Sequence, residues 1–462
     1  MIKQSKKGLV LVLAIVFVVL MFASCGGNAP ATGGGSAPAP GSSAAAPGSS
    51  GGGSAPGTAP ATIKIGIPNP TTGPLASFGI GTDWAEKLVV DYVNKDGGVF
   101  MKEYNKKIPL ELYVVDTQSD SNKATEVTQQ LITNNQVNLL LARHTPNTVL
   151  PVSQVAESNS MPCIALDCPI EAWQSGAPAG GYQWVYNSFW SVEKDAAPLY
   201  IDMWKQVGLG SGTKVGFLFP NDADGIAWRA VFEKQAPAAG YVITDPGDYP
   251  IGNTDWTAII NKFKAAGVEI ICGNDITPDV VSFMNAAAQQ KLSYKLVTIG
   301  RGVLFPTDAN AMAPEIADGL TSEVWWSPWH PWSSSLTGMT CPELAKAYEQ
   351  STGQGWSAPM GYKYAGMEIA VDVLTRAGSL DPTAIRDAIG ATDLDTMVGH
   401  IKYDPTTHVA PTPIVGGQWK LNADKSAVEL RIVNNNAHPN IPTNGTITLP
   451  ASGDGPMPAA PF

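Results

Sequence analysis

The sequence predicts an α/β protein with two doubly wound lobes, and three observations support this prediction. Short β-branched runs alternate with segments that carry apolar residues at helical spacing, a pattern typical of parallel sheets with helices on both faces. The alternation occurs twice, over residues 63–166 and again over residues 214–299. The region 62–436 is also too long for one ordinary hydrophobic core, which favours two lobes.

The first cycle of strands and helices is predicted over residues 63–166. Its first helix is inferred from Trp84, Leu88 and Tyr92, which recur at helical spacing. Gly97-Gly98 then ends the pattern. The predicted strands are 63–68, 110–115, 137–141 and 162–166, and the predicted helices are 83–96, 122–135 and 147–159.

The second cycle has the same organisation. Its predicted strands are 214–219, 241–244, 269–272 and 295–299, and its predicted helices are 226–239, 256–266 and 278–290. Neither cycle carries the G-x-G-x-x-G fingerprint of dinucleotide sites, so we expect no nicotinamide or flavin cofactor. Ligands of such sheets bind beyond the carboxyl ends of the strands. We therefore expect the two lobes to close on a small molecule in a cleft between those ends.

The first 25 residues have the pattern of an export signal. Three lysines precede an uncharged, mostly apolar stretch, and two small residues then precede Cys25. The pattern resembles the bacterial lipobox, which implies that Cys25 receives a diacylglycerol and becomes the new N-terminus at a membrane. An uncleaved transmembrane anchor is the alternative, because the apolar run approaches the ~18 residues that span a bilayer. Both readings place the rest of the chain outside the cytoplasm.

Composition separates a folded body from its flanks. Residues 26–61 contain only Gly, Ala, Ser, Pro and Thr apart from Asn28, so we expect a disordered tether there. Residues 437–462 are again rich in Pro, Gly and Ala, and we expect a flexible tail. The chain has 29 basic and 40 acidic residues, a formal net charge of −11. This acidic balance argues against nucleic acid as a partner.

The cysteines and histidines do not predict a metal site. Cys272 lies in an apolar run that reads as a buried strand, which indicates an inert core residue. Cys163 and Cys168 are close enough for a small-loop disulfide, and the sequence leaves their pairing open. The five histidines are scattered and no zinc-like spacing occurs.

Several short motifs, each weak alone, resemble the branched-chain amino-acid-type solute-binding proteins of ABC importers when they are taken in order. They are spread over about residues 62–420. The matching segments are 64–67, 72–76, 78–79, 91–94, 97–99, 254–257, 264–267 and 401–404.

The resemblance implies a type I periplasmic-binding-protein fold, in which three crossovers join two Rossmann-like lobes. We expect crossovers near residues 186–190, 325–332 and 399–408. Lobe one would then comprise residues 62–186 and 337–396, and lobe two residues 187–332 and 397–436.

Tryptophans cluster at two of the expected crossovers. Trp325, Trp326, Trp329 and Trp332 lie within one short segment, and Trp190 ends another. Packing between the lobes accounts for any single ring. A tryptophan run interrupted by proline cannot form a regular helix or strand. We therefore expect at least one of these rings to contact the ligand, by stacking on a planar group or surrounding a cation.

In lobe one, the resemblance places ligand contacts at the ends of the first strands. Ser77 and Phe78 occupy the loop after the first strand, at the border of the cleft. Thr145 stands where the family has a serine that holds the ligand carboxylate. Arg143 and His144 replace the family's small residues there, which puts the family's usual ligand in question.

Further candidates follow the later strands. Cys168 and Pro169 occupy the next family contact, which usually carries a hydroxyl group. Asp224 and Trp228 lie where the family has an aromatic contact. Asp279 falls near the family's acidic contact to an ammonium group, although a helix N-terminus also favours an acid there.

Arg301 follows a predicted strand and is a candidate for bidentate pairing with a ligand carboxylate, with a surface ion pair as the alternative. We therefore expect a small ligand with a carboxylate and an apolar or aromatic part, such as an amino acid or an aromatic acid. A cation held by tryptophan rings and aspartates is the second possibility.

The expected function is non-enzymatic: a monomer captures a small solute and delivers it to an ABC permease. A ligand sensor of the same fold is the alternative, and the sequence does not separate the two. A secreted hydrolase would need paired carboxylates or a Ser/His/Asp set. No G-x-S-x-G motif is present, and Asp222 with Asp224 is the one acid pair that stands out.

Overall fold

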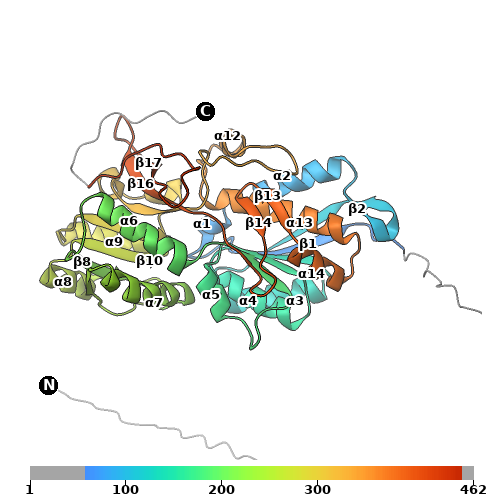
Figure 1. Ribbon diagram of the computed structural model, residues 1–462, viewed down its shortest axis with the longest axis horizontal. Coiled ribbons are helices and arrows are strands. Elements are labelled where there is room, and N and C mark those ends of the chain that lie inside the picture. The colour runs from blue at the N-terminus through green and yellow to red at the C-terminus, as the bar shows by residue number, and fades with distance from the viewer. Residues whose placement is uncertain (1–57, 450–462) are drawn as a thin grey trace, which may run out of the picture. The chain divides into compact units, whose positions relative to one another are not determined.

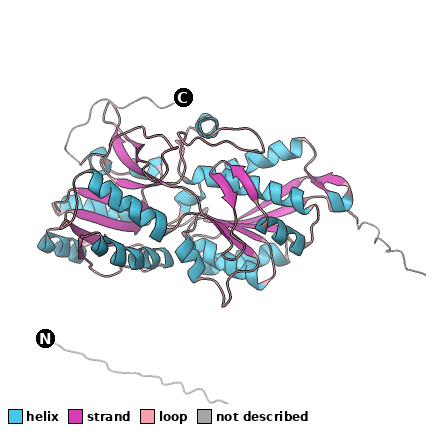
Figure 2. Ribbon diagram, in the orientation of Figure 1, coloured by secondary structure: helices cyan, strands magenta, loops and turns pink. Residues whose placement is uncertain are grey.

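The computed structural model describes residues 58–449, and its main features are two β-sheets with helices on both faces (Figures 1 and 2). The predicted signal at 1–25, including Cys25, lies outside the described residues, as do most of the predicted tether and residues 450–462. Among the helices of residues 58–449, none has the length and apolar character needed to cross a membrane.

The first sheet is entirely parallel and has the strand order β15-β7-β6-β5-β1-β4. Ile63, Ile65 and Ile67 of the interior strand β1 are fully buried, as expected for a sheet covered on both faces. The strands are β1 (Ile63–Asn69), β4 (Leu110–Asp116), β5 (Leu139–Ala142), β6 (Cys163–Leu166), β7 (Val185–Ser188) and β15 (Val409–Ala410).

Helices from distant parts of the chain cover this sheet. On one face α2 (Thr82–Lys95) packs beside α13 (Pro359–Ala377), with α14 (Pro382–Gly390) next to them (Figure 1). On the other face lie α3 (Ser121–Thr133) and α4 (Pro146–Ser158). Helices from the C-terminal third of the chain therefore complete the layer on one face of the first sheet.

The second sheet has the order β17-β16-β12-β11-β10-β8-β9. Its β9-to-β12 part is parallel, and β16 and β17 add antiparallel strands at one edge. The strands are β8 (Lys214–Leu218), β9 (Val242–Thr244), β10 (Ile270–Asp275), β11 (Leu296–Arg301), β12 (Thr321–Val324), β16 (Val415–Leu421) and β17 (Val428–Asn434). The helices are α6 (Ala197–Gln206) and α7 (Ala223–Ala238), and, in a separate core cluster, α8 (Thr257–Ala266) and α9 (Thr277–Gln289).

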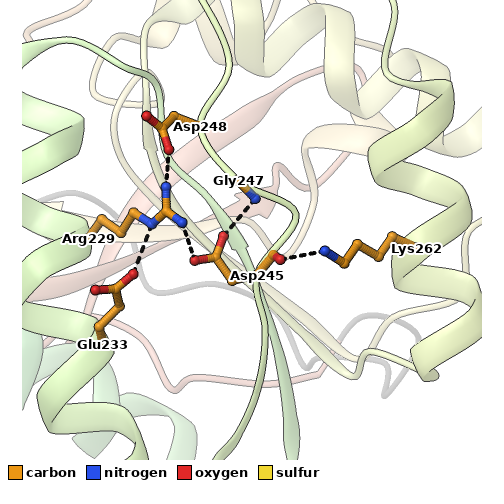
Figure 3. Close-up of polar contacts among 6 residues, drawn as sticks. All are labelled: Arg229, Glu233, Asp245, Gly247, Asp248 and Lys262. Atoms are coloured by element: carbon orange, nitrogen blue, oxygen red, sulfur yellow. Dashed lines mark hydrogen bonds and ion pairs between the residues drawn. The ribbon is translucent and has the colours of Figure 1, made fainter.

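An ion-pair cluster joins α7 to the segment that follows β9 (Figure 3). Arg229 of α7 pairs with Glu233 at 3.0 Å and also with Asp245 and Asp248 of that segment. Lys262 of α8 donates to the Asp245 carbonyl oxygen at 2.6 Å. The cluster fixes the body of α7, and the N-terminal end of this helix carries Asp224, one of the predicted site residues.

The predicted strands and helices of both cycles are present, with bounds that differ by a few residues, so the α/β fold with two wound lobes is confirmed. Elements that the sequence did not predict are α1 (Ala76–Gly79), β2 (Val99–Met101), β3 (Lys106–Ile108), α5 (Ile170–Ser175), α10 (Pro306–Ala309), α11 (Pro314–Ala317), α12 (Cys341–Thr352), β13 (Asp393–Thr396) and β14 (Gly399–Lys402), together with β7, α6, α13, α14, β12 and β15 to β17.

The chain passes three times between the two sheets. It leaves the first sheet after β7, returns after β12, and crosses again between β15 and β16. The third passage lies at residues 411–414, later than the expected range 399–408. The reason is that Val409 and Ala410 are buried and extend the first sheet by pairing with β7.

The segment 437–449, which composition predicted to be flexible, packs on lobe two. Ile441 is fully buried and Ile447 nearly so. The backbone of Thr448 both donates to and accepts from the Gln418 side chain, at 2.9 and 2.8 Å. Buried apolar side chains within a Pro- and Asn-rich segment account for this order.

Candidate functional site

A closed pocket lies between the two lobes. The volume open to the centre of a water molecule is only about 10 Å³, close to the minimum that one water needs. The two lobes thus meet around a space that is almost shut. Its lining residues are Phe78, Thr145, Asp167, Pro169, Phe189, Trp190, Asp224, Trp228, Asn274, Arg301, Glu323 and Trp325.

The lining side chains come from the carboxyl ends of parallel strands in both sheets. In lobe one, the segments after β1, β5, β6 and β7 supply them. In lobe two, they come from the start of α7 after β8 and from the ends of β10, β11 and β12. This is the position where doubly wound sheets bind ligands.

Aromatic rings form the walls of the pocket. Trp190 meets Trp228 edge to face, with ring centroids 5.7 Å apart and an interplanar angle of 88°. Trp325 lies at 87° to Phe189, with centroids 4.8 Å apart. Trp325 is also nearly parallel to Phe78, at 29° and 6.4 Å. These geometries are the ones aromatic pairs prefer, and they surround the polar groups with apolar surface.

Four non-glycine residues at or next to the pocket have left-handed backbone conformations. The φ values are 71° for His144, 69° for Thr145, 59° for Asp167 and 61° for Arg301. Thr145 combines this φ with a ψ of 156°, a region that is essentially reserved for glycine. Such strain persists only where the surrounding structure enforces it, and it concentrates at functional sites.

A buried ionic network supports the lobe-one side of the pocket. Arg143 lies 3.2 Å from Glu86 and 3.3 Å from Asp167, and all three side chains are fully buried. His144 Nδ1 lies 3.2 Å from Asp167 Oδ2, and its Nε2 lies 3.2 Å from the Thr82 hydroxyl. The Nδ1 contact with Asp167 is a close approach and not a hydrogen bond, because Nδ1 has no hydrogen-bond partner within residues 58–449.

Burial and neighbouring charges give the ionisable groups of this network different protonation states at neutral pH. Burial alone would raise the pKa of Asp167, but the Arg143 guanidinium and the contact with His144 outweigh burial and lower it. Burial raises the pKa of Glu86 to about 8, against the effect of Arg143. Burial lowers the pKa of His144 to about 3. At neutral pH Asp167 is therefore ionised, His144 is neutral and Glu86 is largely protonated.

Lys363 of α13 completes the network. Its ammonium group donates to the Ile80 carbonyl oxygen, and its side chain is fully buried. Burial, and then repulsion from Arg143, lowers the pKa of Lys363 to about 7. At neutral pH, Arg143 with Asp167 is therefore the main charged pair of this buried network.

The lobe-two side of the pocket is organised around Arg301. Its Nη1 lies 2.7 Å from Asp222 Oδ2 and 3.3 Å from Asp224 Oδ2, and its Nη2 donates to the Asn274 carbonyl oxygen at 3.2 Å. Burial raises the pKa of Asp224 to about 6, while Arg301 opposes the shift and Asp222 adds to it. One guanidinium thus faces two carboxylates.

Glu323 adds a further buried acid on the strand β12. It accepts a hydrogen bond from the Tyr200 hydroxyl at 2.5 Å and from the Arg301 backbone N–H at 3.3 Å. Burial raises the pKa of Glu323. The lobe-two part of the pocket therefore holds more acidic than basic groups.

Several buried polar atoms of the lining residues have no hydrogen-bond partner within residues 58–449. Buried polar groups are almost always paired, so each such atom calls for an explanation. Donors and acceptors both occur among them, and they come from both lobes. The atoms are Thr145 Oγ1, Asp167 Oδ1, Trp190 Nε1, Asp224 Oδ1, Trp228 Nε1, Asn274 Nδ2 and Arg301 Nε.

The structure brings together in this pocket seven of the residues predicted to contact the ligand. They are Phe78, Thr145, Pro169, Trp190, Asp224, Arg301 and Trp325. Arg301, predicted as a partner for a ligand carboxylate, already contacts two carboxylates of the protein. Trp228, also expected near the ligand, lines the pocket as well.

Three other predicted residues, His144, Cys168 and Ser77, do not line the pocket but are neighbours of residues that do. His144 contacts the Asp167 carboxylate. Cys168 is buried, and its carbonyl oxygen accepts from Asn187. Ser77 donates to Asp308 at 3.1 Å, which joins the loop after β1 to lobe two.

Three further predicted residues lie away from the pocket lining. Asp279, at the start of α9, accepts from the Gly252 backbone N–H at 3.0 Å. Trp326 donates to Cys341 Sγ at 3.1 Å. Trp329 lines a separate cavity of about 230 Å³.

Sequence reasoning missed Asp167, Phe189, Asn274 and Glu323. Asp167 and Asn274 carry a signal that was available, because each stands at the carboxyl end of a predicted strand. Glu323 carries a weaker signal, because it is the one acidic residue of the strand β12. Cys163 and Cys168, whose pairing the sequence left open, are free buried thiols among the described residues.

Comparison with known proteins agrees with this geometry. Residues 62–426 match the family model described as periplasmic binding protein. A Leu/Ile/Val-binding protein homologue of Brucella abortus (strain 2308) is 23% identical over 376 residues, which cover 78% of this chain and 89% of that protein.

Solved structures share the fold. The leucine-binding protein LivK of Thermotoga maritima has a TM-score of 0.68 at 17% identity, covering 81% of this chain and 99% of that one. A solute-binding protein of Rhodopseudomonas palustris in complex with 3,4-dihydroxybenzoic acid has a TM-score of 0.65 at 19% identity, covering 80% and 95%. The chain therefore belongs to the periplasmic binding protein family and has the type I fold of that family.

Proposed function

We propose that this protein captures a small solute in the closed pocket between its lobes and delivers it to an ABC permease. One observation carries the proposal: both lobes contribute buried polar atoms without partners within residues 58–449 to the same pocket. Leaving a buried donor or acceptor unsatisfied costs about 1–3 kcal/mol. A ligand that pairs with several of these atoms would therefore hold the two lobes together.

The role is binding and not catalysis. The pocket carboxylates Asp167 and Asp224 are each tied to an arginine through one oxygen. At neutral pH both are ionised, because the pKa of Asp167 is lowered and that of Asp224 is about 6, and two fixed charges of this kind suit the recognition of a ligand. We further propose that the protein acts as a monomer, with one ligand for each chain.

An amino acid fits the pocket best among the ligands expected from the sequence. Its ammonium group can pair with a carboxylate oxygen, and its carboxylate can accept from the free N–H groups of Trp190, Trp228 or Asn274. A purely acidic aromatic ligand fits less well, because Asp222 and Asp224 already face Arg301.

A thermal-shift screen of the full-length chain tests this function. The panel comprises amino acids, aromatic acids, short peptides, amines and sugars. A true ligand raises the apparent stability by about 2.7 kcal/mol at a hundredfold excess over Kd. Trp228→Ala removes one pocket wall and should abolish the shift. The matched control Trp184→Ala changes a tryptophan outside the pocket lining that stacks on the half-buried Arg386, and it should leave the shift intact. A panel without any shift, or a shift insensitive to Trp228, would refute capture in the cleft.

We also propose that the mature chain begins at a lipid-modified Cys25 and is held at the membrane by that lipid. The family works outside the cytoplasm, and the sequence before Cys25 has the pattern of a lipoprotein signal. Growth with a clickable fatty acid should label the wild-type protein and not Cys25→Ala. A chain that is unlabelled but still membrane-bound would instead support the uncleaved anchor.

A further inference from the structure

The two pocket aspartates have the same arrangement, although they come from different lobes. Asp167 Oδ2 is 3.3 Å from Arg143, and Asp224 Oδ2 is 3.3 Å from Arg301. In each case the other oxygen, Oδ1, has no partner among the described residues. Both side chains are nearly fully buried, at 1% and 3% exposure for the residues. Each lobe thus presents one fixed carboxylate with one free oxygen to the same pocket.

We propose that Asp167 and Asp224 together clamp a protonated nitrogen of the ligand, one carboxylate from each lobe. The ligand class is then an amine, including amino acids, and an acid without such a nitrogen is excluded. This inference rests on the proposed capture function and specifies its ligand.

Charge balance supports the clamp. Arg143 balances Asp167, but Arg301 faces both Asp222 and Asp224. The pocket therefore holds at least one negative charge more than its arginines neutralise. Carboxylates that share a dry site repel one another unless a cation or a proton lies between them. Burial raises the pKa of Asp224 to about 6 and Asp222 adds to the shift, while Arg301 opposes it only in part.

The aromatic walls favour the same ligand class. Trp190, Trp228 and Trp325 border the space that both aspartates line. A cation near the faces of tryptophan rings gains up to about 2 kcal/mol when it is desolvated. The Asn274 amide lies near Asp224 and lowers its pKa, but forms no hydrogen bond with the free oxygen. That oxygen remains available to a ligand donor.

Two sets of matched probes test the clamp on the full-length chain. Phenylalanine, 2-phenylethylamine and 3-phenylpropionate share a ring, and valine, isobutylamine and isovalerate share a smaller apolar group. In each set the second compound lacks the carboxylate and the third lacks the protonated nitrogen. The probes that carry a nitrogen should bind in calorimetry for at least one of the two sizes, whereas the matching acid should not.

Variants assign the binding to the two aspartates. Asp167→Asn and Asp224→Asn should each weaken the binding of the nitrogen-bearing probes by about 10- to 100-fold, as expected for hydrogen bonds to charged groups. Asp372→Asn, on the exposed face of lobe one, should leave binding unchanged. Circular dichroism would verify that each variant folds.

The outcomes separate the clamp from the capture function. Equal or tighter binding of the acids, or unchanged affinity in both Asn variants, would overturn the clamp while capture in the cleft stands. The clamp is also overturned if neither probe set binds and the solute found in the broader screen has no protonated nitrogen. If no solute binds at all, or binding is independent of Trp228, the capture function itself fails.

Discussion

Removal of the Arg143 guanidinium should destabilise lobe one severely. Arg143 is fully buried, 3.2 Å from Glu86 and 3.3 Å from Asp167. In Arg143→Met, Asp167 keeps a buried carboxylate with only neutral His144 beside Oδ2 and with Lys363 at a pKa near 7. Breaking a buried pair by removing one partner costs about 3–5 kcal/mol. Glu86, with a pKa of about 8, is already protonated and should contribute little to this cost.

Urea unfolding of the ligand-free chain at pH 7, followed by tryptophan fluorescence, measures the effect. The control is Arg376→Met, which removes a partner of Asp372 in a pair whose side chains are 33% and 26% exposed, together with hydrogen bonds to the Ala388 carbonyl oxygen and the Thr392 hydroxyl. The surface pair itself contributes about 0–1 kcal/mol. The Arg143→Met transition should therefore shift far more than the Arg376→Met transition.

A double variant tests the mechanism of the loss. Because the cost comes from an unpaired Asp167, adding Asp167→Asn to Arg143→Met should recover part of the stability, with a coupling of about 1–3 kcal/mol. The reasoning is refuted if Arg143→Met costs no more than Arg376→Met. It is also refuted if Asp167→Asn adds its full separate cost to that of Arg143→Met.

Three further predictions follow from buried groups. Burial lowers the pKa of His330 to about 3 from 6.5, so the unfolded chain takes up its proton first, and His330 alone lowers stability by about 1.4 kcal/mol for each unit that the pH falls between 6.5 and 3. His144 contributes a similar slope, so His330→Asn should reduce the overall slope in urea titrations from pH 7 to 4.5 without abolishing it, and an equal slope would contradict the assignment. A Cβ at Gly361 would lie 2.3 Å from Trp326, so Gly361→Ala should cost about 1–3 kcal/mol, whereas Gly210→Ala, with open space around it, should change the melting temperature little. In a Cys25→Ser background, a thiol reagent should label none of the four buried cysteines of the folded body and all four in denaturant, and only two labelled thiols would reveal a disulfide.

The strands and helices of the wound cycles were predictable because their signals are local. Buried parallel strands read as β-branched runs, and the first helix shows its apolar stripe directly in the sequence. The edge strands β16 and β17 were not predicted. Four of the seven residues of β16 are Gly, Gln or Lys, and pairing with β12 and β17 holds them in the sheet. Where the local β-propensity is weak, pairing with neighbouring strands therefore determines whether a segment forms a strand.

The pocket was predictable in position but not in its individual contacts. Trp325 and Trp326 are neighbours after β12, yet one lines the pocket and the other packs on Cys341. Asp167 was missed although its neighbours Cys168 and Pro169 were predicted. It has a φ of 59°, a left-handed conformation that is uncommon outside glycine and that the spacing of the sequence does not reveal. Side-chain direction in these loops depends on backbone conformations that spacing does not reveal.

The unpaired polar atoms of the pocket connect ligand capture to lobe closure. Both carboxylates and the tryptophan N–H groups can reach water when the lobes separate, but they lose it when the lobes meet. Each group left unpaired on closure costs about 1–3 kcal/mol, so the closed form is disfavoured until a ligand supplies partners. A ligand shifts the equilibrium only by its differential affinity for the two forms. Because its contacts come from both lobes, the contacts with the second lobe are gained only in the closed form and supply that difference. Under the proposed function, closure then reports occupancy to the permease.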